Sequence, residues 1–410
     1  MYKCGSVLLL CWGTTGLALN GLRPIGVSAE SNAMGGTGVS SFYNYYDALY
    51  KNPSLMATAP GRIGQSQAVF GMTYGQFLPK VKATYGEDQA YKKPITGTAA
   101  AFPSSIGYGQ RIYDRLSMAV GVYGGGGGAD YGPEADSVYR ARSRTFTFSL
   151  TTGVSWAFTP DTSVGINGTW SSVETRASNL SVTKGTMTEI GGKSQTVGTL
   201  VGIRHQIDRL TLGAIFQPKQ TAFINDARDI DEDGVRDNLL FTAVPTEYAV
   251  GANWTDDNWM ATADVRMLEW GEAEFLKSVG WKNQNVLALG WEYGGSQRIR
   301  LGYNVSTSAV SNRKGTNGFA TVQTSQKPLI NLASDAFATT SALGVTNQHY
   351  TIGSTHRITE ALKINTAYVY FEPGSLERSG SYKVDTGIKI YGWRSVFGGS
   401  TLSADLTYLW

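Results

Sequence analysis

The segment DIDEDGVRDN, residues 229–238, carries carboxylates at a spacing that suits a hard cation. Asp229, Asp231, Asp233 and Asp237 alternate with other residues around a glycine, and Ca²⁺ prefers oxygen ligands in such loops. The loop is not an EF-hand, because Leu240 stands where that motif supplies a bidentate glutamate. Two interpretations stay open, a calcium site and an acidic solvated loop, of which the solvated loop is the simpler. No other cofactor is expected.

Residues for catalysis are scarce. The chain has three histidines, His205, His349 and His356, all near the ends of expected strands. Ser155, in GVSWA, lacks the sharp strand-to-helix turn that exposes a nucleophilic serine. An enzyme is therefore not expected.

The elements that carry these residues are long alternating strands. In residues 145–170 apolar side chains alternate with small or polar ones on both sides of Pro160-Asp161. A strand with this period of two presents one apolar face and one polar face. Each limb is long enough to cross a bilayer when tilted, and the tight turn is typical of the periplasmic side of outer-membrane barrels.

The same pattern recurs along the chain and predicts about fourteen strands, the first two near 63–74 and 98–110. Short connections near 111–114, 159–161, 207–209, 255–258, 294–297 and 358–361 separate longer ones. We predict an all-β, antiparallel transmembrane β-barrel whose short turns face the periplasm. After the leader no apolar run reaches eighteen residues, and a net charge of +3 from scattered residues gives no sign of a nucleic-acid partner.

Strand phase assigns one set of basic residues to the outside of the barrel. Arg140, Arg142 and Arg144 share the phase of Phe146, so they are expected to project outward above the lipid. Arginine suits bidentate contacts to phosphate, which makes lipopolysaccharide a candidate partner. A solvated loop end is the alternative.

A second set of charges has the opposite phase. Asp264, Arg266, Glu292, Arg298 and Arg300 are expected to face the lumen, where they could form a network that holds a plug. A carboxylate-binding role for Arg298 or Arg300 is the less favoured alternative.

The two ends of the chain carry targeting signals. Residues 1–18 have a basic start, an apolar centre and a small-residue cleavage site, which predicts a secretory signal peptide. Both cysteines lie within it, so the mature chain is expected to have no disulfide. At the other end, Trp410 closes an alternating strand and resembles the signal read by the barrel assembly machinery. Its simpler role is that of an interfacial aromatic residue.

Residues 19–61 do not alternate, and a barrel of this size would leak unless a segment filled it. We therefore predict a hatch at 19–61 and a barrel at 62–410. The stretch SNAMGGTGV, followed by Asp47 and then by Asn52, Pro53 and Ser54, resembles the hatch of FadL-type outer-membrane transporters. That family usually has Asn-Pro-Ala, and serine is small enough for the turn.

The resemblance continues in AFPSSIGYGQRIYDRLSMAVGVYGGGGGADYG and in NVLALGWEYGGSQRIRLGYNVS. It implies a monomeric fourteen-stranded barrel in the outer membrane of a Gram-negative bacterium. It also implies uptake of hydrophobic small molecules, such as long-chain fatty acids or aromatic hydrocarbons, which leave sideways beside a kink in the third strand.

A run of glycines stands where that kink is expected: Gly124, Gly125, Gly126, Gly127 and Gly128. Glycine within a strand marks a bend or a bulge, so we assign the run to a lateral gate. A flexible start of an extracellular loop is an equal alternative. For the whole protein, the alternatives to transport are an adhesin or structural barrel and, less favoured, a barrel lipase. The hatch-like segment favours transport over both.

Overall fold

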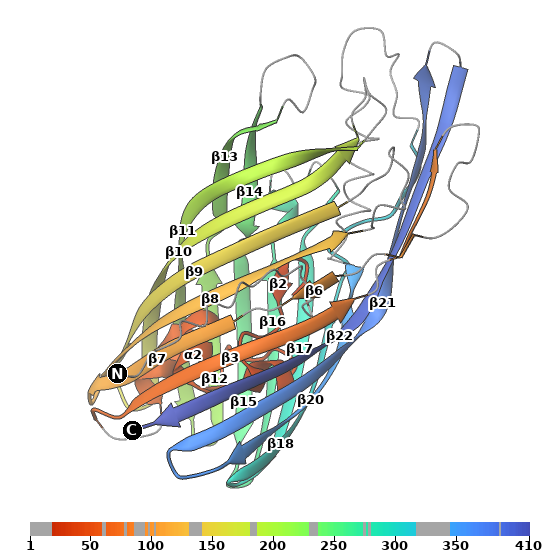
Figure 1. Ribbon diagram of the computed structural model, residues 1–410. Coiled ribbons are helices and arrows are strands. Elements are labelled where there is room, and N and C mark those ends of the chain that lie inside the picture. Colours follow the sequence, from red (N-terminus) through yellow and green to blue (C-terminus); the bar gives the residue numbers. More distant parts are fainter. Residues whose placement is uncertain are drawn as a thin grey trace, which may run out of the picture.

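The computed structural model describes residues 19–59, 63–77, 80–85, 95–96, 99–101, 104–130, 142–180, 187–228, 237–273, 276–277, 280–316, 345–384 and 387–410. Within them, the strands form one closed antiparallel barrel of fourteen strands, and some of these strands are divided into two successive segments (Figure 1). The predicted all-β barrel is confirmed. No helix in these ranges is both long and apolar enough to cross a membrane.

The barrel and its extensions are built from β3 to β22. Their bounds are Ser66–Phe77 (β3), Lys80–Tyr85 (β4), Ile95–Thr96 (β5), Ala99–Ala101 (β6), Ser104–Tyr113 (β7), Leu116–Asp130 (β8), Arg142–Ala157 (β9), Thr162–Leu180 (β10), Met187–Ile207 (β11), Leu210–Gln217 (β12), Gln220–Arg228 (β13), Asp237–Val244 (β14), Glu247–Thr255 (β15), Trp259–Leu268 (β16), Gln284–Gly294 (β17), Gln297–Ser306 (β18), Arg313–Thr316 (β19), Gln348–Arg357 (β20), Leu362–Val384 (β21) and Gly387–Leu409 (β22). β13 and β14 form a separate two-stranded sheet.

The alternation in the sequence becomes the two faces of the wall. In β9, Phe148 and Leu150 are exposed on the outer face, whereas Ser149 and Thr151 are buried inside. β9 and β10 pair from Ala157–Ser163 to Ser143–Ala177 without a register shift. A one-residue slip would turn every apolar side chain into the lumen, so this pattern fixes the register.

The barrel closes between its last and first strands. β22 pairs with β3 from Leu409–Gln67 to Gly399–Phe77, and the backbones of Trp410 and Ser66 exchange two hydrogen bonds at 3.0 and 3.1 Å. The tight turns at 114–115, 158–161, 208–209, 256–258, 295–296 and 358–361 join consecutive strands at one end of the barrel, called here the short-turn end.

Residues 19–59, called here the hatch, lie inside the barrel (Figure 1, red). The hatch contains β1 (Leu19–Asn20), β2 (Arg23–Pro24), α1 (Ala29–Ala33), α2 (Tyr45–Lys51) and the 3-10 turn η1 (Pro53–Thr58). Ser28 caps α1 in a capping box with Ser31, and the side chain of Asn44 accepts from the Asp47 amide at 2.7 Å to cap α2. Such caps stabilise helices that are too short to persist alone. One further 3-10 turn, η2 (Trp270–Glu272), follows β16.

Candidate functional site

Inward-facing glycines let the hatch approach the wall closely. A side chain at any of them would crowd or overlap hatch atoms: Gly107, Gly109, Gly121, Gly153, Gly165, Gly202, Gly213, Gly251, Gly290, Gly302 and Gly353. Gly165 faces the Pro53 carbonyl group, and Gly202 faces the side-chain oxygen of Asn52. Glycine in a strand is unfavourable by itself, so a belt of glycines on this face indicates close backbone approach.

The hatch motif lies against this belt. The Asn52 amide donates to the carbonyls of Val39 at 2.6 Å and Ile203 at 3.2 Å, and so joins two parts of the hatch to β11. The Ser54 hydroxyl donates to Asn52 at 2.6 Å, and the Ser163 hydroxyl of β10 donates to the Ser54 carbonyl at 2.8 Å. Serine therefore adds a hydrogen bond to this turn that alanine could not make.

One group of ion pairs joins the hatch to β17 and β18. Arg300, 1% exposed, contacts Glu292 at 2.6 Å and Glu30 of the hatch at 3.2 Å. Arg298 pairs with the other oxygen of Glu292 at 2.6 Å. Its side chain is 46% exposed, so this part of the group reaches solvent.

A second group holds the hatch to β15 and β16. Asp264 accepts from the backbone amides of Gly38 at 2.8 Å and Val39 at 3.0 Å. Arg266 pairs with Glu247 of β15, and Glu247 pairs with Arg23 of the hatch at 2.9 Å. The five charges that face the lumen by strand phase thus lie inside the barrel. Asp264 and Arg300 touch the hatch directly, whereas Arg266 reaches it through Glu247.

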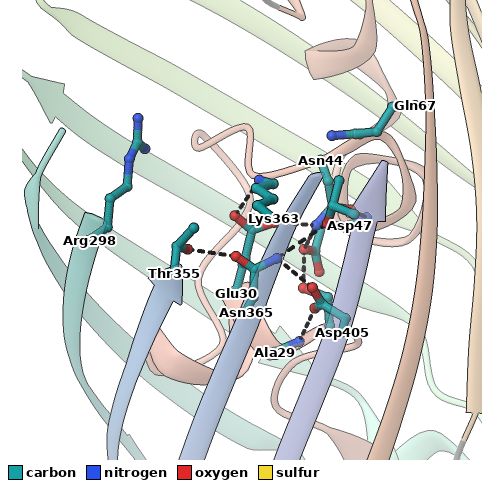
Figure 2. A network of polar contacts seen from close by, with 12 residues as sticks. Ala29, Glu30, Asn44, Asp47, Gln67, Arg298, Thr355, Lys363, Asn365 and Asp405 are labelled. Atoms are coloured by element: carbon teal, nitrogen blue, oxygen red, sulfur yellow. Dashed lines mark hydrogen bonds and ion pairs between the residues drawn. The ribbon is translucent and has the colours of Figure 1, made fainter. Parts of the chain in front are cut away.

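The wall strands β21 and β22 supply further contacts that sequence phase had not singled out (Figure 2). Lys363 pairs with Glu30 at 2.9 Å, and Asp405 accepts from the Ala29 amide at 2.8 Å. Asn365 links Asp405 to the Thr355 hydroxyl of β20. Lys363, Asn365 and Asp405 alternate with apolar residues, so phase could have assigned them to the lumen. Glu30, in contrast, lies outside any alternating strand, and no sequence pattern marks it.

The buried ionisable groups of the hatch differ in how well they are compensated. Burial would raise the pKa of Glu30, but Lys363 and Arg300 outweigh it and hold that pKa below its usual value. Burial raises the pKa of Asp47 to about 6 despite hydrogen bonds from serines. Burial also lowers the pKa of Lys51, whose ammonium donates to the carbonyls of Ile25 and Gly36.

Below the hatch, a cavity of about 810 Å³ opens at the short-turn end and is called here the vestibule. Phe42 and Tyr43 of the hatch line it, together with polar wall residues such as Arg204, Arg298 and Asp256. Charged side chains at its mouth suit water, so the vestibule offers little to an apolar molecule.

At the strand ends away from the short turns, two apolar clusters of described residues lie inside the barrel. The Trp270 cluster comprises Leu268, Trp270, Ala273, Leu276, Trp281, Val286, Ala309, Val310, Val345, Leu376 and Phe397, and Leu22 of the hatch packs against it. Leu22 also contacts a second cluster of Val173, Ala222 and Ile224. The hatch therefore lies between these apolar clusters and the polar vestibule.

The glycine run Gly124–Gly128 lies in β8, and its pairing with the neighbouring strand β9 is regular. It pairs with β9 from Gly124–Phe148 to Gly128–Arg144 without a register shift. Toward β7 the described part of the ladder ends at Ser104–Gly124, and residues 102–103 lie outside the described part. Tyr50 and Tyr46 of the hatch donate to the carbonyls of Gly121 at 3.3 Å and Val122 at 3.4 Å, just before the run.

Other residues singled out in the sequence lie partly or wholly outside the described part. Arg140, Asp229, Asp231 and Asp233 lie outside it, and Arg142, Arg144 and Asp237 are described only as strand backbone. The lipopolysaccharide contact and the calcium site stay predictions.

Trp410 is 54% exposed at the short-turn end, with its ring 5.8 Å from that of Tyr108. This position suits an interfacial aromatic residue. Recognition of Trp410 by the barrel assembly machinery stays a prediction.

The histidines lie apart from one another. His349 is fully buried in β20 beside Phe371, whereas His205 bonds Thr162 and His356 bonds Gln297 in exposed positions. Ser155 is buried on the inner face of β9 and has no hydrogen-bond partner among the described residues. These positions do not bring a histidine to Ser155.

No protein-family model matches the chain, and no curated protein matches its sequence. Solved structures do match. A FadL homologue from Pseudomonas aeruginosa aligns with a TM-score of 0.70 at 15% identity, over 95% of this chain and 99% of that one. The chain has the FadL-type fold. The toluene transporter TodX of Pseudomonas putida aligns with a TM-score of 0.63 at 16% identity, over 96% of this chain and all of that one. The toluene transporter TbuX of Ralstonia pickettii aligns with a TM-score of 0.58 at 14% identity, over 93% and 98%.

Proposed function

We propose that this protein is a FadL-type transporter that takes up hydrophobic small molecules, such as long-chain fatty acids or aromatic hydrocarbons, across the outer membrane of a Gram-negative bacterium. The ligand is captured in the apolar interior and leaves sideways into the membrane. The observation that carries this proposal is the division of the lumen by the hatch, with the Trp270 cluster on one side and the polar vestibule on the other.

The physical basis is the burial of apolar surface. A hydrophobic molecule gains roughly 25 cal/mol for each Å² removed from water, so it binds an apolar interior without any charge. The same molecule would have to displace buried ion pairs to pass the hatch into the vestibule, and breaking such pairs is costly. A path through the wall avoids this cost.

The glycine run is the proposed exit. Its glycines carry no side chains that would fill the wall, and Tyr46 and Tyr50 of the hatch contact the strand just before the run. The chemistry of release is then a partition from the apolar interior into lipid, and it needs no energy source.

Binding and accumulation of a radiolabelled apolar ligand test the proposal. Trp281→Ala removes a buried ring of the Trp270 cluster, whereas Trp291→Ala removes an outward ring that is 41% exposed. We expect Trp281→Ala to weaken binding severalfold and Trp291→Ala to leave it unchanged. If wild-type protein neither binds the ligand nor raises its accumulation in cells, the adhesin or structural alternative is favoured instead.

A further inference from the structure

Three carboxylates meet where α1 and α2 touch the wall (Figure 2). Glu30 is 2%, Asp47 1% and Asp405 3% exposed. Asn44 joins two of them, because its side-chain amide donates to Glu30 and to Asp47 at 2.8 Å each. Ala29, next to Glu30, donates its backbone amide to Asp405 at 2.8 Å. The three groups thus belong to one hydrogen-bonded cluster, called here the acid cluster.

The cations that face the acid cluster are too few to balance it. Lys363 of β21 and Arg300 of β18 both pair with the same oxygen of Glu30, and Arg300 is shared with Glu292 of β17. On α2, Lys51 gives its ammonium to two backbone carbonyls.

The remaining groups around Asp47 carry no positive charge. Ser28 donates to it, and Tyr46 is the neighbouring titratable group on α2. Neither oxygen of Asp47 has an ion-pair partner, and one has no hydrogen-bond partner among the described residues. A buried carboxylate without a cation is costly as an anion.

We propose that the acid cluster is a proton-binding latch, in which the docked hatch holds a proton at Asp47 that the undocked hatch releases, so that the hatch plugs the barrel more tightly at mildly acidic pH. This function is separate from ligand uptake, because it concerns the occlusion of the lumen to ions.

The direction follows from linkage. Burial raises the pKa of Asp47 to about 6 in the docked hatch, against an ordinary value of 3.8 in water. Docking is therefore weaker above pH 6, strengthens as pH falls through 6, and levels off below about 3.8. With these values, the linkage of Asp47 alone makes the docking equilibrium about tenfold more favourable at pH 5 than at pH 7. Glu30 stays ionised over this range, because Lys363 and Arg300 lower its pKa.

Conductance of the full-length protein in planar bilayers tests the latch. We expect the fraction of time spent in a conducting state to rise about tenfold between pH 5 and pH 7. Asp47→Asn resembles the protonated residue, so it should stay closed more of the time and lose the part of the pH response that belongs to Asp47. Asp405, which also has no cation partner among the described residues, keeps its own part in this variant. Asp257→Asn makes the same change at an exposed position that lines the vestibule, and it should keep the wild-type response.

Hydrogen exchange of hatch peptides gives a second readout. Wild-type and Asp47→Asn peptides from residues 29–51 are compared at the same pH. Above pH 6 the wild-type peptides should exchange faster, and below pH 5 the two proteins should exchange equally. Ser28→Ala removes a donor to the charged carboxylate and should move the transition to higher pH. A wild-type protein with no pH response, or an Asp47→Asn variant that keeps the full wild-type response, overturns the latch. Loss of ligand binding would contradict only the transport proposal.

Discussion

Arg300 is the buried cation of the wall that pairs both with Glu30 of the hatch and with Glu292. Arg300→Ala leaves Glu30 and Glu292 buried with one cation fewer, and breaking a buried pair costs about 3–5 kcal/mol. We expect a clear loss of thermal stability and a leaky barrel in planar bilayers. Arg298→Ala removes a half-exposed partner of the same Glu292, where an ion pair contributes only about 0–1 kcal/mol. If the two substitutions lower thermal stability and raise conductance equally, Arg300 does not have the proposed role in holding the hatch.

Two glycines of β10 allow a test of whether glycine is needed for close contact between the wall and the hatch or only tolerated in the strand. A side chain at Gly165 would overlap the Pro53 carbonyl group, whereas nothing lies within 4 Å of one at Gly168. We expect Gly165→Ala to dislodge η1, which would appear as increased ion conductance with normal barrel insertion. Gly168→Ala should behave as wild type or fold slightly better, because alanine suits a strand more than glycine does. A silent Gly165→Ala would mean that the hatch can move away at little cost.

At the residue scale, the sequence indicated more about the wall than about the hatch. Strand phase identified Asp264 and Arg300 as lumen charges because a period of two leaves only two faces. Glu30 and Asp47 could not be found in this way, since their positions depend on how an irregular segment folds against many strands. The partner of each wall charge depends on the tertiary structure, which strand phase does not predict.

The hatch is the described segment that lies inside the barrel, and we expect it to decide whether the lumen is occluded. Removing residues 21–58 would expose the glycine belt and the charges of the wall to water. We expect the shortened protein to insert as a barrel and to conduct ions far better than the intact protein in planar bilayers. Equal, low conductance in both would mean that other segments fill the lumen.

Gly125 and Gly126 of β8 allow a test of the exit. A side chain at Gly125 would crowd the ring of Tyr123, and valine at both positions favours a regular, filled strand. We expect purified Gly125→Val/Gly126→Val protein to bind a radiolabelled apolar ligand normally while cells at matched surface expression accumulate less of it. If accumulation is unchanged, the exit does not lie at these glycines. If binding is lost as well, these glycines line the ligand pocket.

Elements were predictable to different degrees for a physical reason. Long strands such as β9 and β10 follow from alternation, because one lipid-facing and one inward face leave a regular pattern. The first strand, expected near 63–74, lies at Ser66–Phe77, and the second, expected near 98–110, consists of β6 and β7. The short helices α1 and α2 have caps but too few residues for a helical period, so only the lack of alternation at 19–61 and the motif around Asn52 indicated a hatch.

At the scale of the whole molecule, the proposed transport leaves two routes for a bound ligand, through the hatch or through the wall. A covalent bond between hatch and wall distinguishes them. Ala33 of α1 and Ala367 of β21 belong to one buried cluster, so we choose them for a cysteine pair that removes no charge, and mass spectrometry after oxidation shows whether the disulfide forms. The disulfide prevents the hatch from leaving.

We expect cells that express the oxidised Ala33→Cys/Ala367→Cys protein to accumulate an apolar ligand as fast as cells with the same protein after reduction. The reason is that the wall route bypasses the ion pairs that hold the hatch. Each single cysteine variant controls for the substitutions themselves. Accumulation that falls on oxidation and returns on reduction would mean that the ligand passes through the hatch, and the lateral route would then be abandoned.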